Sequence, residues 1–388
     1  MSTASSSSTN QKVVVFDFGA QYGQLIARRV RDLNVYSEIV PCDITADEVR
    51  EMAPAAIILS GGPASVNAED APRVDPAIYE LGVPILGFCY GHQVTSVTLG
   101  GSVYHPEVGE YGPATLHVSG GDLFAGTPAD QTVWMSHFDA VKDIPEGFTV
   151  VASTDVCPVA AMECPERKIY TTQFHPEVKH TEFGNQMLKN FLFEICGLEP
   201  NWTMDNLVDT LTADFREKVG SDRVILALSG GVDSSVVAAL GARAVGKQMT
   251  CVFVNHGLLR KGEPEQVEEV FTKQFDVDFI HVHAEERYAK LLDGVTDPEQ
   301  KRRIIGTQFW EEFFTVAQQL DGVKYLAQGT IYPDIIESGA RKTGGKAATI
   351  KSHHNLIPFP EGVHFDLIEP LDHFFKDEVR ALGTALGL

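Results

Sequence analysis

The sequence predicts an α/β protein of two domains, each a mostly parallel sheet flanked by helices. Three observations predict this fold class: a length of 388 residues, short apolar runs that alternate with amphipathic stretches, and glycine-containing turns after several apolar runs. This length exceeds one ordinary domain and fits two of about 190 residues. Alternating strand and helix patterns are typical of parallel sheets covered by helices.

The elements fall into two series. In the first we expect strands at 13–18, 57–60 and 84–88 and helices at 24–32 and 92–99. In the second we expect strands at 224–228, 250–254, 279–282 and 325–327 and helices at 234–244, 265–274 and 302–319. Each apolar run is short enough for a strand, and each helix has a spaced apolar face.

The domain boundary is predicted near Gly197, where one helical pattern ends before a Pro-containing stretch. We assign residues 11–199 to the first domain and 200–388 to the second. Residues 1–10 are rich in Ser and Thr and have no basic region or apolar core, so we interpret them as a disordered tail and not a secretory signal. Residues 333–355 are rich in Gly, Lys and Ser without a clear period, which predicts either a mobile functional loop or disorder.

Composition excludes several classes of function. The net charge of −22 argues against nucleic acid or an anionic membrane as a partner, because both favour positive surfaces. No apolar run approaches the length of a membrane span. The six cysteines form no CxxC pair, which favours the reducing cytosol and a cytoplasmic location.

A cysteine lies at the predicted junction of a strand and a helix. Gly87, Cys89 and Gly91 form a G-x-C-x-G pattern, which is typical of a nucleophile elbow. The positive end of the following helix would favour a thiolate. The stretch from Gln173 to Glu177 supplies His175 as a candidate base, and Glu177 as the group that fixes its tautomer.

A glycine loop after another strand completes the candidate site. The backbone N–H groups of Gly61 and Gly62 could approach a developing oxyanion, with the N–H of Tyr90 as a further donor. Taken alone, a cysteine after a strand or a His-Pro-Glu turn is more often structural. The three features together, within one domain, favour nucleophilic catalysis.

On these residues, 11–198 resemble the class I glutamine amidotransferases. The resemblance includes Gly91-His92-Gln93 after the nucleophile and Met135-Ser136-His137 before the base. It implies that Cys89 hydrolyses glutamine through a thioester and releases ammonia. It also implies that Gln93 and the backbone near His137 hold the glutamine.

A phosphate-binding loop follows the first strand of the second domain. Its glycines and hydroxyls suit an anion at a helix N-terminus, and it has no lysine at its end, which disfavours a kinase-type P-loop. The loop resembles the signature of the ATP pyrophosphatases, which implies that it binds ATP and that its aspartate helps to place Mg²⁺. Its residues are Ser229, Gly230, Gly231, Val232, Asp233, Ser234 and Ser235.

In this order the two domains resemble the family of glutamine-hydrolysing GMP synthases, including the stretches 250–260, 327–334, 350–355 and 375–380. The resemblance implies that ATP adenylylates xanthosine monophosphate and that ammonia then displaces AMP. It implies Val254 beside adenine, Arg302 at the acceptor phosphate, a lid over the synthetase site at 333–355, and Mg²⁺ with ATP. The basic Lys351 within that segment is a further candidate at the acceptor. No organic prosthetic group is expected, and His281 and His283 lack the context of a zinc site.

The family resemblance stops before the family's C-terminal dimerisation domain. We therefore expect a homodimer for a full-length chain, and we expect these 388 residues to be monomeric and to make little or no GMP. Two alternatives remain open: an ATP-pyrophosphatase amidotransferase with another acceptor, and a regulatory sensor of glutamine or nucleotide.

Overall fold

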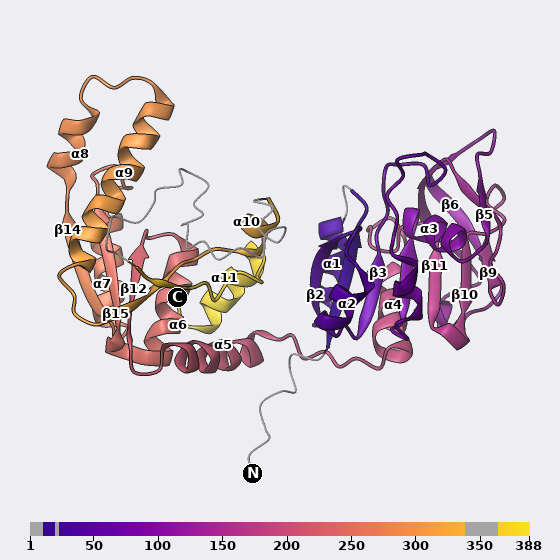
Figure 1. Ribbon diagram of the computed structural model, residues 1–388, viewed down its shortest axis with the longest axis horizontal. Coiled ribbons are helices and arrows are strands. Elements are labelled where there is room, and N and C mark those ends of the chain that lie inside the picture. The colour runs from indigo at the N-terminus through magenta and orange to yellow at the C-terminus, as the bar shows by residue number, and fades with distance from the viewer. Residues whose placement is uncertain (1–10, 20–22, 338–363) are drawn as a thin grey trace, which may run out of the picture. The chain divides into compact units, whose positions relative to one another are not determined.

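The structure is a computed structural model that describes residues 11–19, 23–337 and 364–388 (Figure 1). The chain divides into two compact units between Thr203 and Met204. Each unit has its own sheet and its own hydrophobic core. The predicted tail at 1–10 lies outside the described residues, as does most of the predicted lid.

The first unit alternates strands and helices before it becomes rich in strands. Its elements are β1 (Lys12–Asp17), α1 (Gly23–Asp32), β2 (Tyr36–Pro41), α2 (Ala46–Met52), β3 (Ala56–Leu59), η1 (Pro76–Glu80), β4 (Ile85–Phe88), α3 (Tyr90–Thr98), β5 (Ser102–Tyr104), β6 (Glu110–Val118), η2 (Asp122–Phe124), β7 (Asp130–His137), β8 (Ala140–Asp143), β9 (Thr149–Ser153), β10 (Ala161–Cys164), η3 (Pro165–Arg167), β11 (Ile169–Thr172), α4 (Gly184–Lys189) and the π-helical turn η4 (Asn190–Ile195).

Nine strands of this unit form one sheet, in the order β2-β1-β3-β4-β11-β10-β9-β6-β7. The strands from β2 to β11 pair in parallel. The strands from β11 to β7 pair antiparallel. Strands β1, β3 and β4 are buried along almost their whole length, as expected for parallel strands with helices on both faces.

This sheet is therefore mixed, and it corrects the expectation of a mostly parallel sheet in the first unit. The antiparallel strands β6 and β7 escaped prediction because their side chains alternate between more buried and more exposed positions. Strand β6 also carries Gly112 and Pro113, which are unfavourable strand residues. Such one-sided strands have weaker apolar runs than the buried parallel strands.

The second unit keeps the alternation throughout. Its elements are α5 (Met204–Val219), β12 (Arg223–Leu228), α6 (Val232–Val245), η5 (Gly246–Gln248), β13 (Met249–Asn255), α7 (Glu263–Lys273), β14 (Asp278–His283), α8 (Glu285–Leu292), α9 (Pro298–Ala317), β15 (Val323–Ala327), α10 (Tyr332–Glu337), β16 (Asp366–Ile368) and α11 (Lys376–Ala385).

The five strands of the second unit are all parallel, in the order β14-β13-β12-β15-β16. The chain leaves β12 toward β13 on one side and returns to β15 on the other. Adjacent strands whose connections run in opposite directions leave a crevice at their carboxyl ends, where α/β proteins bind ligands. The loop of residues 229–235 follows β12 and so lies at this point.

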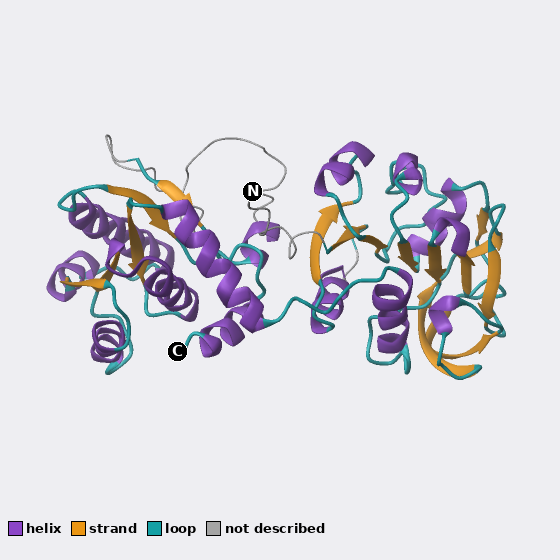
Figure 2. Cartoon of the chain, turned by 90° about the horizontal axis from the view of Figure 1, so that it is seen from below, coloured by secondary structure: helices purple, strands orange, loops and turns teal. Residues whose placement is uncertain are grey.

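The predicted fold class is confirmed: each unit is an α/β layer structure, and Figure 2 shows helices on either side of the strands in both units. The strands and helices predicted in the two series are all present, with ends that differ by at most a few residues. Of the predicted lid, residues up to 337 belong to α10, and 338–355 lie outside the described residues. Within the described ranges, no helix combines the length and apolar character that crossing a membrane requires.

Candidate active site

Three neighbouring parallel strands of the first unit end at one edge of the sheet. Strand β3 leads into Gly61, β4 leads into Cys89, and β11 leads toward His175. Because β4 pairs with both β3 and β11, the three residues that follow these strands are brought together. The sheet topology thus assembles the predicted nucleophile, base and glycine loop from segments far apart in the sequence.

Cys89 has the backbone of a nucleophile elbow. Its φ of 50° and ψ of −99° are strained for a residue with a side chain. The flanking glycines serve close packing, because a Cβ at Gly91 would lie 2.4 Å from the Leu59 carbonyl oxygen and one at Gly87 would lie 2.8 Å from the Gly91 backbone. The glycines therefore let strand and helix pack tightly, while the strained φ falls on the cysteine itself.

His175 and Glu177 form a buried pair beside this cysteine. The Nδ1 atom of His175 lies 2.8 Å from Oε1 of Glu177. Burial would lower the pKa of His175, but the charge of Glu177 and hydrogen bonds with Cys89 and Glu177 hold that pKa well above its usual value. The arrangement places the imidazole between the Cys89 sulfur and a carboxylate, where the ring can hold the proton that the thiol gives up.

The glycine loop lies directly against the pair. A Cβ at Gly61 would lie 3.0 Å from Cε1 of His175 and 3.7 Å from Cβ of Cys89, so only glycine leaves the imidazole its room. A Cβ at Gly62 would lie 2.9 Å from the Phe18 carbonyl oxygen. The Tyr90 side chain points away from the site and donates to the Pro72 carbonyl, so Tyr90 offers the site only its backbone.

A cavity of about 470 Å³ opens in front of Cys89. Gly61, His175, Gln93 and His137 line it, and residues 136–139 form one of its walls. Ser136 in this wall contributes a carbonyl oxygen 3.7 Å from Sγ of Cys89. The cavity is open to solvent, and Cys89 with its strained backbone lies among its lining residues.

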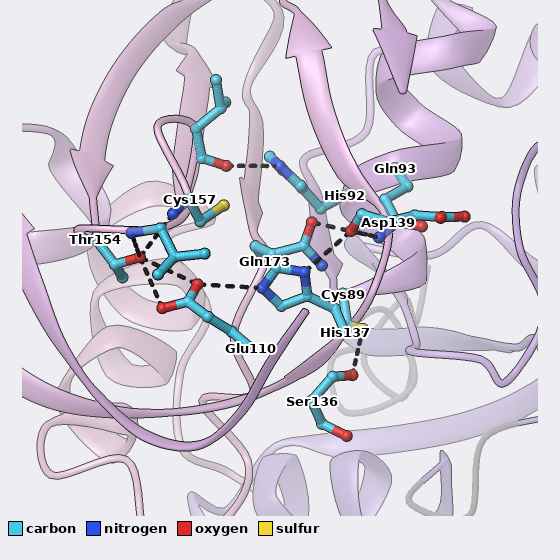
Figure 3. A network of polar contacts seen from close by, with 12 residues as sticks. Cys89, His92, Gln93, Glu110, Ser136, His137, Asp139, Thr154, Cys157 and Gln173 are labelled. Atoms are coloured by element: carbon cyan, nitrogen blue, oxygen red, sulfur yellow. Dashed lines mark hydrogen bonds and ion pairs between the residues drawn. The ribbon is translucent and has the colours of Figure 1, made fainter. Parts of the chain in front are cut away.

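Gln93 and His137 meet at one backbone carbonyl in this wall (Figure 3). The Nε2 atom of Gln93 donates to the Asp139 carbonyl oxygen at 2.7 Å, and Nδ1 of His137 lies 3.0 Å from the same oxygen. Gln93 Nε2 also lies 3.3 Å from Oε1 of Gln173. No sequence pattern indicated a role for Asp139, whose carboxylate contacts Ser65 and His105.

His92, which lies between the elbow and Gln93, has a structural role. Its ring nitrogens lie 2.8 Å from Oγ1 of Thr171 and 3.1 Å from the Val159 carbonyl oxygen. Burial lowers its pKa to about 3, so the ring is neutral. His92 ties α3 to β11 and to the segment before β10, and it does not line the cavity.

In the second unit, the loop of residues 229–235 forms a compact turn at the start of α6. Ser229 and Ser234 share a hydrogen bond of 3.0 Å between their hydroxyls, and the N–H of Gly231 approaches Oγ of Ser229 at 3.3 Å. Gly230 has a φ of 77°, which glycine adopts readily. Gly231 caps α6 without a side-chain hydrogen bond, which leaves the helix N-terminus available to an anion.

The aspartate of this loop has a partner that sequence reasoning did not identify. Nζ of Lys376, at the start of α11, lies 2.7 Å and 2.6 Å from the two carboxylate oxygens of Asp233. Gly329, after β15, packs against the same aspartate, since a Cβ there would lie 3.1 Å from Cβ of Asp233. In the sequence, the only signal at Lys376 is the family resemblance of the stretch 375–380.

The remaining predicted residues are less informative. The Val254 side chain is buried in the hydrophobic core, so any ligand contact at this position would come from its backbone. Arg302 is half exposed on α9 and pairs with Glu299, one turn away. Lys351 lies outside the described residues.

The chain matches two family models. A class I glutamine amidotransferase model matches residues 14–195, and an NAD synthase model matches residues 203–304. A glutamine-hydrolysing GMP synthase of Clostridium acetobutylicum is 53% identical over 379 residues, which cover 97% of this chain and 74% of that protein. One of Streptococcus thermophilus is 56% identical over 382 residues, which cover 97% of this chain and 72% of that protein.

A solved structure of a putative GMP synthase subunit from Thermoplasma acidophilum is 32% identical, with a TM-score of 0.42, and covers 48% of this chain and 94% of that chain. This chain spans about three quarters of the length of the two curated relatives from Clostridium and Streptococcus.

Proposed function

This chain belongs to the family of glutamine-hydrolysing GMP synthases, and from that premise we propose that it forms GMP with ammonia drawn from glutamine. The observation that carries the proposal is the meeting of Cys89, the His175–Glu177 pair and Gly61 at the ends of adjacent strands. This site belongs to one unit, and the ATP pyrophosphatase loop belongs to the other. The two units therefore divide the chemistry into ammonia release and ATP-dependent activation.

In the first unit, Sγ of Cys89 attacks the carboxamide carbon of glutamine. His175 takes the thiol proton and delivers it to the leaving nitrogen, so that ammonia departs and a glutamyl thioester remains. His175 then activates the water that hydrolyses the thioester to glutamate. Glu177 holds the imidazole in the tautomer that this proton transfer requires.

The tetrahedral intermediates carry a negative oxygen beside the glycine loop. The N–H groups of Gly61, Gly62 and Tyr90 are the proposed donors to it. Loss of one such donor typically costs about 3 kcal/mol of transition-state stabilisation. Gln93 and the wall of residues 136–139 are proposed to hold the amino-acid end of glutamine, because they line the same cavity.

In the second unit, we assign the pyrophosphate part of ATP to residues 229–235. The exposed helix N-terminus and loop hydroxyls supply donors for phosphate oxygens. The Asp233 carboxylate, an oxygen ligand of the type Mg²⁺ prefers, would hold the metal that accompanies ATP. In the structure the ammonium group of Lys376 balances the negative charge of the Asp233 carboxylate. With ATP and its metal bound, Lys376 would share that carboxylate with the metal ion.

The acceptor is proposed to be xanthosine monophosphate. Its C2 oxygen attacks the α-phosphorus of ATP and pyrophosphate leaves; ammonia then attacks C2 and AMP leaves. Arg302 and Lys351 remain proposed acceptor contacts, and Val254 a proposed backbone contact of adenine. Cytoplasmic location and a homodimeric full-length protein also remain proposals.

The acceptor assignment is tested by AMP release from a panel of nucleotides and carboxylates, with the complete gene product and ammonia as the nitrogen source. We expect AMP release with xanthosine monophosphate and none above background with the other acceptors. Release with a different acceptor, and none with xanthosine monophosphate, would refute the assignment.

A further inference from the structure

A buried pair of titratable groups supports the wall of the glutamine cavity from behind. Glu110 opens β6 and His137 closes β7, and the antiparallel register places them directly opposite each other. Oε2 of Glu110 lies 3.4 Å from Nε2 of His137, and their side chains are 11% and 3% exposed. Figure 3 shows the carboxylate on one side of the imidazole and the cavity wall on the other.

The two ring nitrogens of His137 have different neighbours. A carbonyl oxygen only accepts, so Nδ1 is the donor to the Asp139 carbonyl oxygen at 3.0 Å. Nε2 faces the Glu110 carboxylate at 3.4 Å, which is an ion-pair distance, and within the described residues no hydrogen bond reaches Nε2. The carboxylate therefore acts on the ring by its charge and by contact.

We propose that Glu110 is a positioning residue for glutamine, acting through His137 on the Asp139 carbonyl and thus on residues 136–139. The proposal rests on the function proposed above, because it assigns that wall to the bound glutamine. Glu110 does not line the cavity itself. Its side chain reaches the wall through the imidazole, which Glu110 keeps oriented toward the Asp139 carbonyl.

Other contacts of the pair agree with this role. The Thr154 hydroxyl lies 2.9 Å and 3.0 Å from the two Glu110 oxygens, so the carboxylate is held in place from the far side. The Asp139 carbonyl receives a second donor from Gln93, which comes from the helix that Cys89 begins. The wall is thus tied both to the elbow and to the buried pair.

The thiol of Cys157 also approaches the pair, and with Glu110 and His137 it could hold a metal ion. Burial and the nearby Glu110 charge raise the pKa of Cys157 to about 12, so the thiol itself is neutral. Thr154 already donates to the carboxylate, and among the described residues only three donor groups gather here, one fewer than structural zinc sites use. A metal site here would need a fourth ligand, whereas an ion pair between Glu110 and His137 accounts for the contact without one.

Steady-state glutamine hydrolysis by the complete gene product tests the proposal. Glu110→Ala should raise KM for glutamine about tenfold, which corresponds to about 1.4 kcal/mol, and should change kcat much less. Glu110→Gln keeps the side-chain shape and the contact with His137 but loses the charge, so it should recover only part of the loss. The matched control is Glu163→Gln, which alters a buried carboxylate that accepts from the Asp122 N–H and should leave KM unchanged.

A double-mutant cycle separates positioning from a general structural effect. His137→Ala should raise KM at least as much as Glu110→Ala does, and adding Glu110→Ala to it should change KM by less than about twofold. Additive effects would overturn the proposal, because Glu110 would then act by another route. The rate at which iodoacetamide alkylates Cys89 should stay constant across the set, which shows that the elbow remains folded.

The outcomes distinguish this inference from the function on which it rests. If the wild-type protein does not hydrolyse glutamine, the proposed function fails. If it does and Glu110→Ala leaves KM unchanged, only the positioning role fails. If Zn²⁺ alters wild-type activity and Cys157→Ser abolishes that response, the three residues form a metal site and the ion-pair interpretation is overturned.

Discussion

Replacing Glu177 with glutamine tests the electrostatic basis of the thiol chemistry. The wild-type carboxylate is buried and lies 2.8 Å from Nδ1 of His175. A hydrogen bond to a charged group is worth about 1.5–3 kcal/mol. Replacing the charged bond between Glu177 and His175 by a neutral one should therefore slow glutamine hydrolysis about 10- to 100-fold. The amide keeps the shape of the side chain, so the loss reports on charge and not on packing.

The same substitution should change the pH dependence of hydrolysis. Burial favours the neutral imidazole, and Glu177 is the main charge that opposes it, so the pKa of His175 should fall in Glu177→Gln. The imidazolium that protonates the leaving nitrogen is then lost at lower pH. The alkaline limb of the kcat/KM profile should therefore move to lower pH.

Stability should follow the same linkage. A folded-state pKa raised above the unfolded value of about 6.5 stabilises the wild-type protein below that pH, and the gain is lost as pH rises through the folded pKa. The difference in Tm between wild type and Glu177→Gln should be largest below about pH 6.5 and should shrink at higher pH.

The assay is ammonia release from glutamine between about pH 5.5 and 10, with Tm measured in the same buffers. Glu182→Gln is the matched control, because Glu182 is an exposed glutamate five residues further along. It should leave both profiles unchanged. Hydrolysis by Glu177→Gln within about twofold of wild type, with no shift of the alkaline limb, would refute the assigned role of the carboxylate.

Three further substitutions probe other parts of the two sites. Gly61→Ala would place a Cβ 3.0 Å from Cε1 of His175, so glutamine hydrolysis should fall about 100-fold while ammonia-dependent synthesis persists; equal loss of both would contradict the division of labour. Gly91→Ala would place a Cβ 2.4 Å from the Leu59 carbonyl oxygen, and thermal unfolding should show a loss of about 3 kcal/mol or more, whereas Gly82→Ala meets no atom within 4 Å and should cost less. Lys376→Met removes the cation that faces Asp233 and should lower ATP-dependent AMP release more than about tenfold, with glutamine hydrolysis in the absence of ATP unchanged.

Features that depend on local pattern could be predicted from the sequence. The G-x-C-x-G stretch between an apolar run and a helix indicated the elbow at Cys89, and the buried parallel strands had continuous apolar runs. The pattern does not say whether the glycines serve the turn or the packing, and the structure shows that Gly87 and Gly91 are needed for close packing. That distinction depends on neighbours such as Leu59, which no local pattern reveals.

Features that depend on distant pairing were not predicted. Glu110 and His137 face each other only because β6 and β7 pair antiparallel, and the weak apolar pattern of these one-sided strands conceals them in the sequence. Lys376 reaches Asp233 from a helix 143 residues away in sequence. His137, Asp233 and Lys376 lie in stretches that the family resemblance includes, but their partners are set by the tertiary fold.

GMP formation by Cys89→Ala in the complete gene product, measured first with glutamine and then with added ammonia, separates the roles of the two units. We predict that synthesis from glutamine is abolished, because the thioester cannot form. Synthesis from ammonia should match wild type, because the ATP-dependent unit is unaltered. Loss of both activities, or retention of glutamine-dependent synthesis, would contradict the assignment of ammonia release to Cys89 and of activation to the second unit.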